Sequence, residues 1–207
     1  MKFSLKVLET EKEIEKAVLK ALLDDASKIM ATASKRLTKK LPIIIETAIT
    51  SQPEYSSLTG GILKDQFGLT NPTTKIDSLL DIWSNINVTY KKPTISASQI
   101  KSNLSIVAIK SDYSDALASA AAEQVTKKGQ SLQWLDWLLN QGDRIIIKEY
   151  ELVSGKGRAG NVGMRKNVKG KWGVPSQFAG SPNNNWITRA IQSVSSIIDR
   201  TLAEALR

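Results

Sequence analysis

A helical repeat of apolar residues near the start of the chain constrains the fold most. From Lys12 to Leu37, apolar side chains recur at steps of three and four residues, which places them on one stripe of a helix. Acidic residues lead this segment and basic residues follow it, the order that the helix dipole favours. The stripe comprises Ile14, Val18, Ala21, Leu22, Ala26, Ile29, Ala33 and Leu37. We therefore predict a long N-terminal helix that covers either its own core or another subunit.

Three shorter helices are expected to complete a mainly helical region over residues 1–84. Pro42 suits the first turn of a helix, so a separate helix is predicted over 43–50. Two more are predicted over 57–67, with an interruption at its glycine pair, and over 74–83.

Strands are predicted in the middle of the chain, where the apolar period changes to two. The segments 87–92, 100–110 and 144–153 alternate as strands do, and a short strand is expected near 171–174. An apolar helix over 131–140 is inserted among them. Residues 85–174 are thus predicted to form a small, mostly antiparallel sheet with an inserted helix.

A C-terminal helix is predicted over 183–207, because three consecutive asparagines offer N-cap side chains before a broad apolar face. Together the elements indicate an α+β fold, in which a long N-terminal helix and a C-terminal helix pack on the small sheet. With 207 residues, the chain fits one domain or at most two small ones, and we predict a single α+β domain over 1–207.

The composition argues against the common enzyme chemistries. The chain contains neither cysteine nor histidine, which removes thiol and histidine catalysis and the usual zinc, haem and iron–sulfur ligands. We predict a protein that is not an enzyme, with no catalytic residue, no metal site and no cofactor. The alternative that stays open is a Mg²⁺-dependent nuclease built from scattered carboxylates such as Asp112, Asp115, Asp136 and Asp143. No apolar run approaches the length of a membrane span, so a membrane partner is not expected.

A glycine-rich basic segment supplies much of the net charge of +9. Residues 155–160 match the G-x-G-x-x-G string, but no acidic residue occurs between Glu151 and Asp199 to hold a ribose, which argues against a dinucleotide site. We interpret 155–171 as a loop that faces a polyanion such as DNA; the alternative is a solvated hairpin tip. The candidate residues are Lys156, Arg158, Arg165, Lys166, Lys169 and Lys171.

The tryptophans are interpreted as core or interface anchors rather than base-stacking platforms. Trp134 and Trp137 lie in an apolar segment, and Trp83, Trp172 and Trp186 receive the same interpretation.

Two segments resemble the tail-completion and neck proteins of tailed bacteriophages. They are residues 51–69 (SQPEYSSLTGGILKDQFGL) and 172–190 (WGVPSQFAGSPNNNWITRA). The resemblance implies a structural virion protein at the head-to-tail junction, assembled in the host cytoplasm. It also implies a homo-oligomeric ring, hexameric for a tail terminator, that contacts the tail-tube protein and a head-closure or connector protein while genomic DNA passes.

The same resemblance implies a subunit interface formed by Trp172, Phe178, Trp186, Ile187 and Ile191. It also implies that the loop 155–171 faces the lumen of the ring or the neighbouring ring. Two alternatives stay open. Residues 71–130 are longer than a minimal member of the family needs, which leaves a head-closure or other neck role. The basic segment leaves a nucleic-acid-binding module.

Overall fold

The computed structural model describes residues 9–96, 98–126, 129–155 and 162–207. Backbone contacts divide the chain into two compact units. The first unit contains residues up to 40 together with 87–107 and 199–207, and the second contains 41–86 and 108–198. The prediction that residues 1–207 form a single domain stays a prediction.

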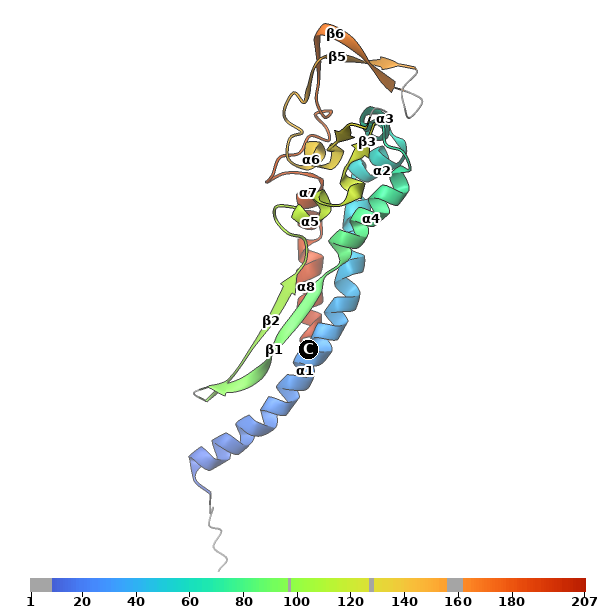
Figure 1. The fold of residues 1–207 in the computed structure, drawn as a ribbon. Helices are drawn as coiled ribbons and strands as arrows, with labels where there is room; N and C mark the ends of the chain where they lie inside the picture. Colours follow the sequence, from blue (N-terminus) through green and yellow to red (C-terminus); the bar gives the residue numbers. More distant parts are fainter. Residues whose placement is uncertain (1–8, 97, 127–128, 156–161) are drawn as a thin grey trace, which may run out of the picture. The chain divides into compact units, whose positions relative to one another are not determined.

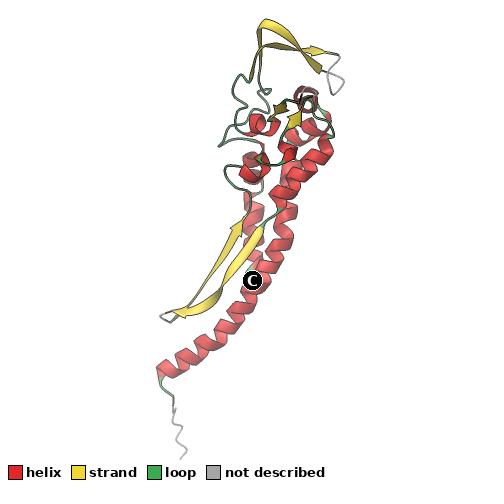
Figure 2. Ribbon diagram, in the orientation of Figure 1, coloured by secondary structure: helices red, strands yellow, loops and turns green. Residues whose placement is uncertain are grey.

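Helices and antiparallel ladders together confirm the predicted α+β class (Figure 2). The strands form three separate two-stranded sheets rather than one sheet: β1 with β2, β3 with β4, and β5 with β6. The helices are α1 (Glu11–Thr50), α2 (Pro53–Gly60), α3 (Ile62–Phe67), α4 (Pro72–Ser84), α5 (Ser114–Leu117), α6 (Trp134–Leu139), α7 (Trp186–Ser193) and α8 (Ser195–Ala205), with a 3₁₀ turn η1 (Ala120–Ala122). The strands are β1 (Asn87–Ser96), β2 (Gln99–Val107), β3 (Gln124–Val125), β4 (Ser131–Leu132), β5 (Ile147–Ser154) and β6 (Val162–Trp172).

Helix α1 begins with a capping box. The backbone N–H of Thr10 donates to Glu13 Oε2 at 2.7 Å, and the N–H of Glu13 donates to Thr10 Oγ1 at 3.4 Å. The bond from the Thr10 N–H, and then a bond from the Thr10 hydroxyl to the same oxygen at 2.8 Å, hold the pKa of the Glu13 carboxyl below its usual value. The pair satisfies donors that a helix N-terminus otherwise leaves free.

Helix α1 also continues through Pro42, so the prediction of a separate helix over 43–50 is wrong. A proline inside a helix removes one backbone hydrogen bond and costs about 3 kcal/mol. The residues on either side offset this cost, since Leu41, Ile45, Ala48 and Ile49 are all buried. Each large side chain of this kind contributes about 1.5–3 kcal/mol on burial.

In the first unit, the β1–β2 hairpin lies alongside α1 (Figure 1). The hydroxyl of Ser34 donates to the carbonyl oxygen of Val88 at 3.1 Å, which ties the helix to the hairpin. Ala33 and Leu37 on the same part of α1 are fully buried. The predicted strands over 87–92 and 100–110 are therefore confirmed as β1 and β2.

The second unit is organised around three fully buried tryptophans, Trp83, Trp134 and Trp186. The rings of Trp83 and Trp186 meet edge to face at 5.5 Å. The indole N–H of Trp186 donates to the carbonyl of Ile49 at 3.1 Å, and that of Trp134 donates to the carbonyl of Ala121 at 2.9 Å. These tryptophans are core residues of a single chain.

The two segments that carry the resemblance pack against each other in this unit. Arg189 forms an ion pair with the buried Glu54, and the indole N–H of Trp172 donates to Gln66 Oε1 at 3.2 Å. Gly180 lies so close to α6 that a Cβ there would stand 2.3 Å from the carbonyl oxygen of Leu138. The residues of these segments are thus fixed by packing.

The predicted C-terminal helix is two helices, which meet at Val194. The hydroxyl of Ser193 donates to the carbonyl of Ala190 at 2.7 Å, and that of Ser195 donates to the carbonyl of Gln192 at 3.1 Å. Serine side chains that bond to the backbone in this way compete with helical hydrogen bonds, which accounts for the break. The predicted N-cap is confirmed, and the capping residue is Asn185.

Candidate functional site

The basic segment interpreted as a loop is mostly strand. From Val162 onward it forms β6, which pairs with β5 as far as Trp172, so the interpretation of 155–171 as a loop is wrong for residues 162–171. Glycines and lysines interrupt the apolar alternation that identifies strands, and this concealed β6 from pattern analysis. Arg165, Lys166, Lys169 and Lys171 lie on this strand, whereas Lys156 and Arg158 lie outside the described residues.

A large bulge interrupts the β5–β6 ladder. Lys148 pairs with Lys171 and Tyr150 pairs with Lys166, so only Glu149 of β5 stands opposite residues 167–170 of β6. Glu149 adopts a left-handed backbone with φ of 62°. Four lysines lie in the bulge or at the ladder positions that border it; we call them the lysine corner: Lys148, Lys166, Lys169 and Lys171. Sequence analysis missed Lys148, which only strand pairing reveals.

A polar network holds one side of this bulge. Glu151 accepts hydrogen bonds from Arg165 Nε at 3.0 Å and from Asn167 Nδ2 at 2.6 Å. The bonds from Arg165 and then Asn167 lower the pKa of the Glu151 carboxyl. The charge of Arg165 is therefore paired within the hairpin, which sets it apart from the lysines.

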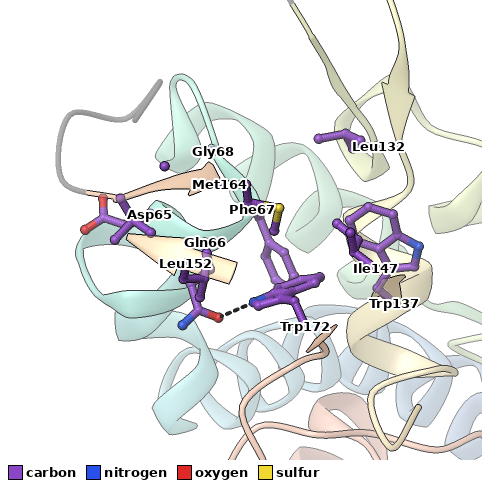
Figure 3. A pocket seen from close by; sticks show the side chains of 12 residues that line it. Asp65, Gln66, Phe67, Gly68, Leu132, Trp137, Ile147, Leu152, Met164 and Trp172 are labelled. Atoms are coloured by element: carbon purple, nitrogen blue, oxygen red, sulfur yellow. Dashed lines mark hydrogen bonds between the residues drawn. The ribbon is translucent and has the colours of Figure 1, made fainter. Parts of the chain in front are cut away.

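Beside the hairpin lies a pocket of about 230 Å³ with an apolar, aromatic lining (Figure 3). The hairpin contributes Leu152, Met164 and Trp172 to the lining, and helices α3 and α6 contribute Phe67 and Trp137. The ring of Trp172 meets Phe67 edge to face at 6.0 Å and Trp137 at 5.9 Å. Such a lining suits an apolar side chain or a packing contact, and Asp65 is the one ionisable group among the described residues that line it.

The residues assigned to a subunit interface are mostly inside the chain. Trp172, Phe178, Trp186 and Ile187 are exposed by 6% or less, so the structure corrects their assignment: they form the core of one chain. Their apolar character identified them as buried, but sequence alone does not distinguish a core from an interface. Ile191 is half-buried and lines a hollow of about 300 Å³.

The carboxylates considered for Mg²⁺ do not converge. Across the described ranges, no group of three or more acidic side chains is placed to hold a metal ion. Asp115 forms an ion pair with Lys110 at 2.6 Å, which raises the pKa of that lysine. Asp136 accepts from Asn140 at 2.8 Å, and Asp112 accepts from the N–H of Ser114 at 3.0 Å, which lowers the pKa of Asp112. These groups have local structural partners.

In the first unit, the apolar stripe of α1 is only partly covered. Ile14, Val18, Leu22 and Ile29 expose 41%, 51%, 50% and 43% of their surface. These four are the large, exposed members of the apolar repeat predicted from the sequence, and we call them the α1 stripe. Farther along the helix, Ile29 also lines a hollow of about 160 Å³, whose other lining residues are Lys28, Thr32, Arg36, Ala205 and Arg207. This unit thus carries two exposed surfaces on α1, the α1 stripe and a basic hollow around Ile29.

Comparison with known proteins adds no relative from which a function could be transferred. No family model, curated protein or solved structure matches the chain. Among the described residues, no helix combines the length and apolar character that crossing a membrane requires.

Proposed function

We propose that the chain is a non-enzymatic structural protein of the tailed-phage neck, a tail-terminator or tail-completion protein whose copies form a ring between the head connector and the tail tube. The observation that carries this proposal is the exposure of the α1 stripe, which is spaced as a buried helix face. A contiguous apolar surface on a protein marks an interaction site. In a ring, a neighbouring copy of the chain would bury these apolar side chains.

Charge along α1 favours a second copy as the partner. The first turns carry Glu11, Glu13 and Glu15, whereas no acidic residue occurs between Asp25 and Glu46. The hollow around Ile29 is basic, with Arg36 among its lining residues. The α1 stripe of one copy therefore complements the hollow of the next in both apolar and electrostatic character.

The two surfaces share Ile29 but otherwise differ: the stripe adds Ile14, Val18 and Leu22, whereas the hollow is lined by residues within 28–36 and 205–207. The contact between them therefore joins unlike surfaces. A contact between unlike surfaces is heterologous, and its repetition closes into a ring or continues as a filament. A neck protein needs the closed form. The resemblance of residues 51–69 and 172–190 to phage neck proteins supplies the biological setting, and their mutual packing supports a scaffold role for them.

Sedimentation velocity over a range of concentrations tests the contact. We expect the wild-type chain to form a species larger than a dimer, and Val18→Gln with Leu22→Gln to remain monomeric. The matched control is Lys16→Gln with Lys20→Gln, which changes two exposed residues on the opposite face of α1 and should assemble as wild type. A wild-type chain that is monomeric throughout contradicts the contact, and one that stops at a dimer contradicts the ring.

Deletion of the reading frame from its phage genome tests the setting. Electron microscopy should then show filled heads and tails that are not joined. Normally joined particles from the deletion phage would contradict a neck role. Restoration of joining by the wild-type chain, but not by the Val18→Gln, Leu22→Gln variant, would link the role to the α1 stripe.

A further inference from the structure

The lysine corner concentrates positive charge: four lysines border a bend in which Glu149 is the one acidic residue of the ladder positions they flank. Lys148 and Lys171 are direct ladder partners, and like charges in that position destabilise a sheet. None of the corner's four lysines forms an ion pair with another described residue. Glu151 already binds Arg165 and Asn167. The hairpin therefore keeps a repulsive arrangement that an anionic ligand would relieve.

The backbone around these lysines is held in place. The N–H of Lys169 donates to Asn167 Oδ1 at 3.1 Å, and Asn167 is in turn bonded to Glu151 at 2.6 Å. Gly170 packs against Tyr150 so closely that a Cβ would lie 2.4 Å from the Tyr150 carbonyl oxygen. Because the bend is fixed by these contacts, the charges are gathered before any ligand arrives, which lowers the ordering cost of binding.

We infer that the lysine corner binds the phosphate backbone of nucleic acid without reading its sequence. Lysine acts as a point charge toward phosphate. Protein interfaces are depleted in lysine, which argues against an acidic protein partner. Membrane association needs a larger apolar face than the segment 166–171 provides, since Val168 is its one apolar residue. The inference stands apart from the ring proposal, because it depends on a different unit of the chain.

Binding to phosphates sets a measurable salt dependence. Each neutralised phosphate on duplex DNA contributes about −0.9 to the slope of log affinity against log salt concentration, so four contacts give about −3.6. Between 50 and 200 mM salt this slope lowers affinity about 150-fold. Loss of three contacts leaves a slope of about −0.9.

Fluorescence anisotropy with a labelled DNA duplex of random sequence and the full chain tests the inference. The test variant combines Lys148→Gln, Lys169→Gln and Lys171→Gln. The matched control combines Lys91→Gln, Lys92→Gln and Lys101→Gln, three exposed lysines of the β1–β2 hairpin. We expect the test variant to lose more than tenfold in affinity at low salt with a slope near −0.9, and the control to bind as wild type.

Thermal unfolding separates loss of binding from loss of folding. The test variant should melt at or above the wild-type temperature, because it removes a pair of opposed like charges. Equal losses in test and control variants, or no salt-dependent binding by the wild type, would overturn the inference. So would binding to polyglutamate or to phosphatidylserine vesicles as tight as binding to DNA at the same salt. The oligomeric state in the same samples shows independently whether the ring proposal survives.

Discussion

At the scale of single residues, Asn185 joins more elements than any predicted N-cap needs to. Its Oδ1 accepts from the N–H groups of Ile187 and Thr188, each at 3.1 Å, and its Nδ2 donates to the carbonyl of Ser181 at 3.0 Å. The side chain also bonds the hydroxyl of Tyr113 and is fully buried. One amide therefore caps α7 and fixes the loop before it.

Asn185→Ala is expected to destabilise the chain by about 3 kcal/mol, since it removes a cap and leaves buried polar groups without partners. Urea unfolding measures the loss. Asn183→Ala is the matched control, because Asn183 is exposed and should change stability by less than about 0.5 kcal/mol. Similar values for both variants would show that the amide bonds of Asn185 contribute little.

Glu151 gives a prediction on pH. Its hydrogen bonds to Arg165 and Asn167 lower the pKa of the carboxyl from about 4.5, so its stabilising effect is present at neutral pH. That effect is lost as the pH falls through the lowered pKa. Glu151→Gln should thus be less stable than wild type at pH 7, with a difference that closes in acid. A difference that stays constant with pH would contradict it; Glu149→Gln on the same strand is the control.

At the scale of elements, sequence periodicity predicted most helices and the β1–β2 hairpin, because their apolar residues follow one period. Periodicity did not predict the elements whose bounds depend on strand pairing or on packing. The bulge of β6 has no period, and α6 begins only at Trp134 because Ser131 and Leu132 pair with β3. Likewise, the sequence predicted the lysine corner as a basic segment but not as a bend that includes Lys148, because the local sequence does not determine which strand pairs with which.

Replacing Pro42 measures how far the packing of α1 compensates for the low helix propensity of proline. Pro42→Ala removes the cost of a proline inside a helix, about 3 kcal/mol for the missing hydrogen bond and the ring clash together, but the more flexible unfolded chain offsets about 0.4–1 kcal/mol of this gain. The net expectation is a gain of about 2 kcal/mol in the free energy of unfolding, measured in urea. Ile43→Ala, at a position 65% exposed, should change it little. A destabilised Pro42→Ala variant would mean that the packing of α1 requires the backbone that proline imposes.

At the scale of the whole molecule, the proposed assembly would also complete the folding of the start of α1. Every residue from Glu11 to Val18 is exposed, and an isolated helix of this length is marginal in water even with a capping box. Contact with a second copy would supply the burial that these turns lack.

We therefore expect amide hydrogen exchange over residues 12–22 to slow as protein concentration rises, while residues 45–50 stay protected at every concentration. The Val18→Gln, Leu22→Gln variant should exchange rapidly over 12–22 throughout. Equal protection of these turns at low and high concentration would show that the helix needs no partner, and the exposed stripe would then lose its role in assembly.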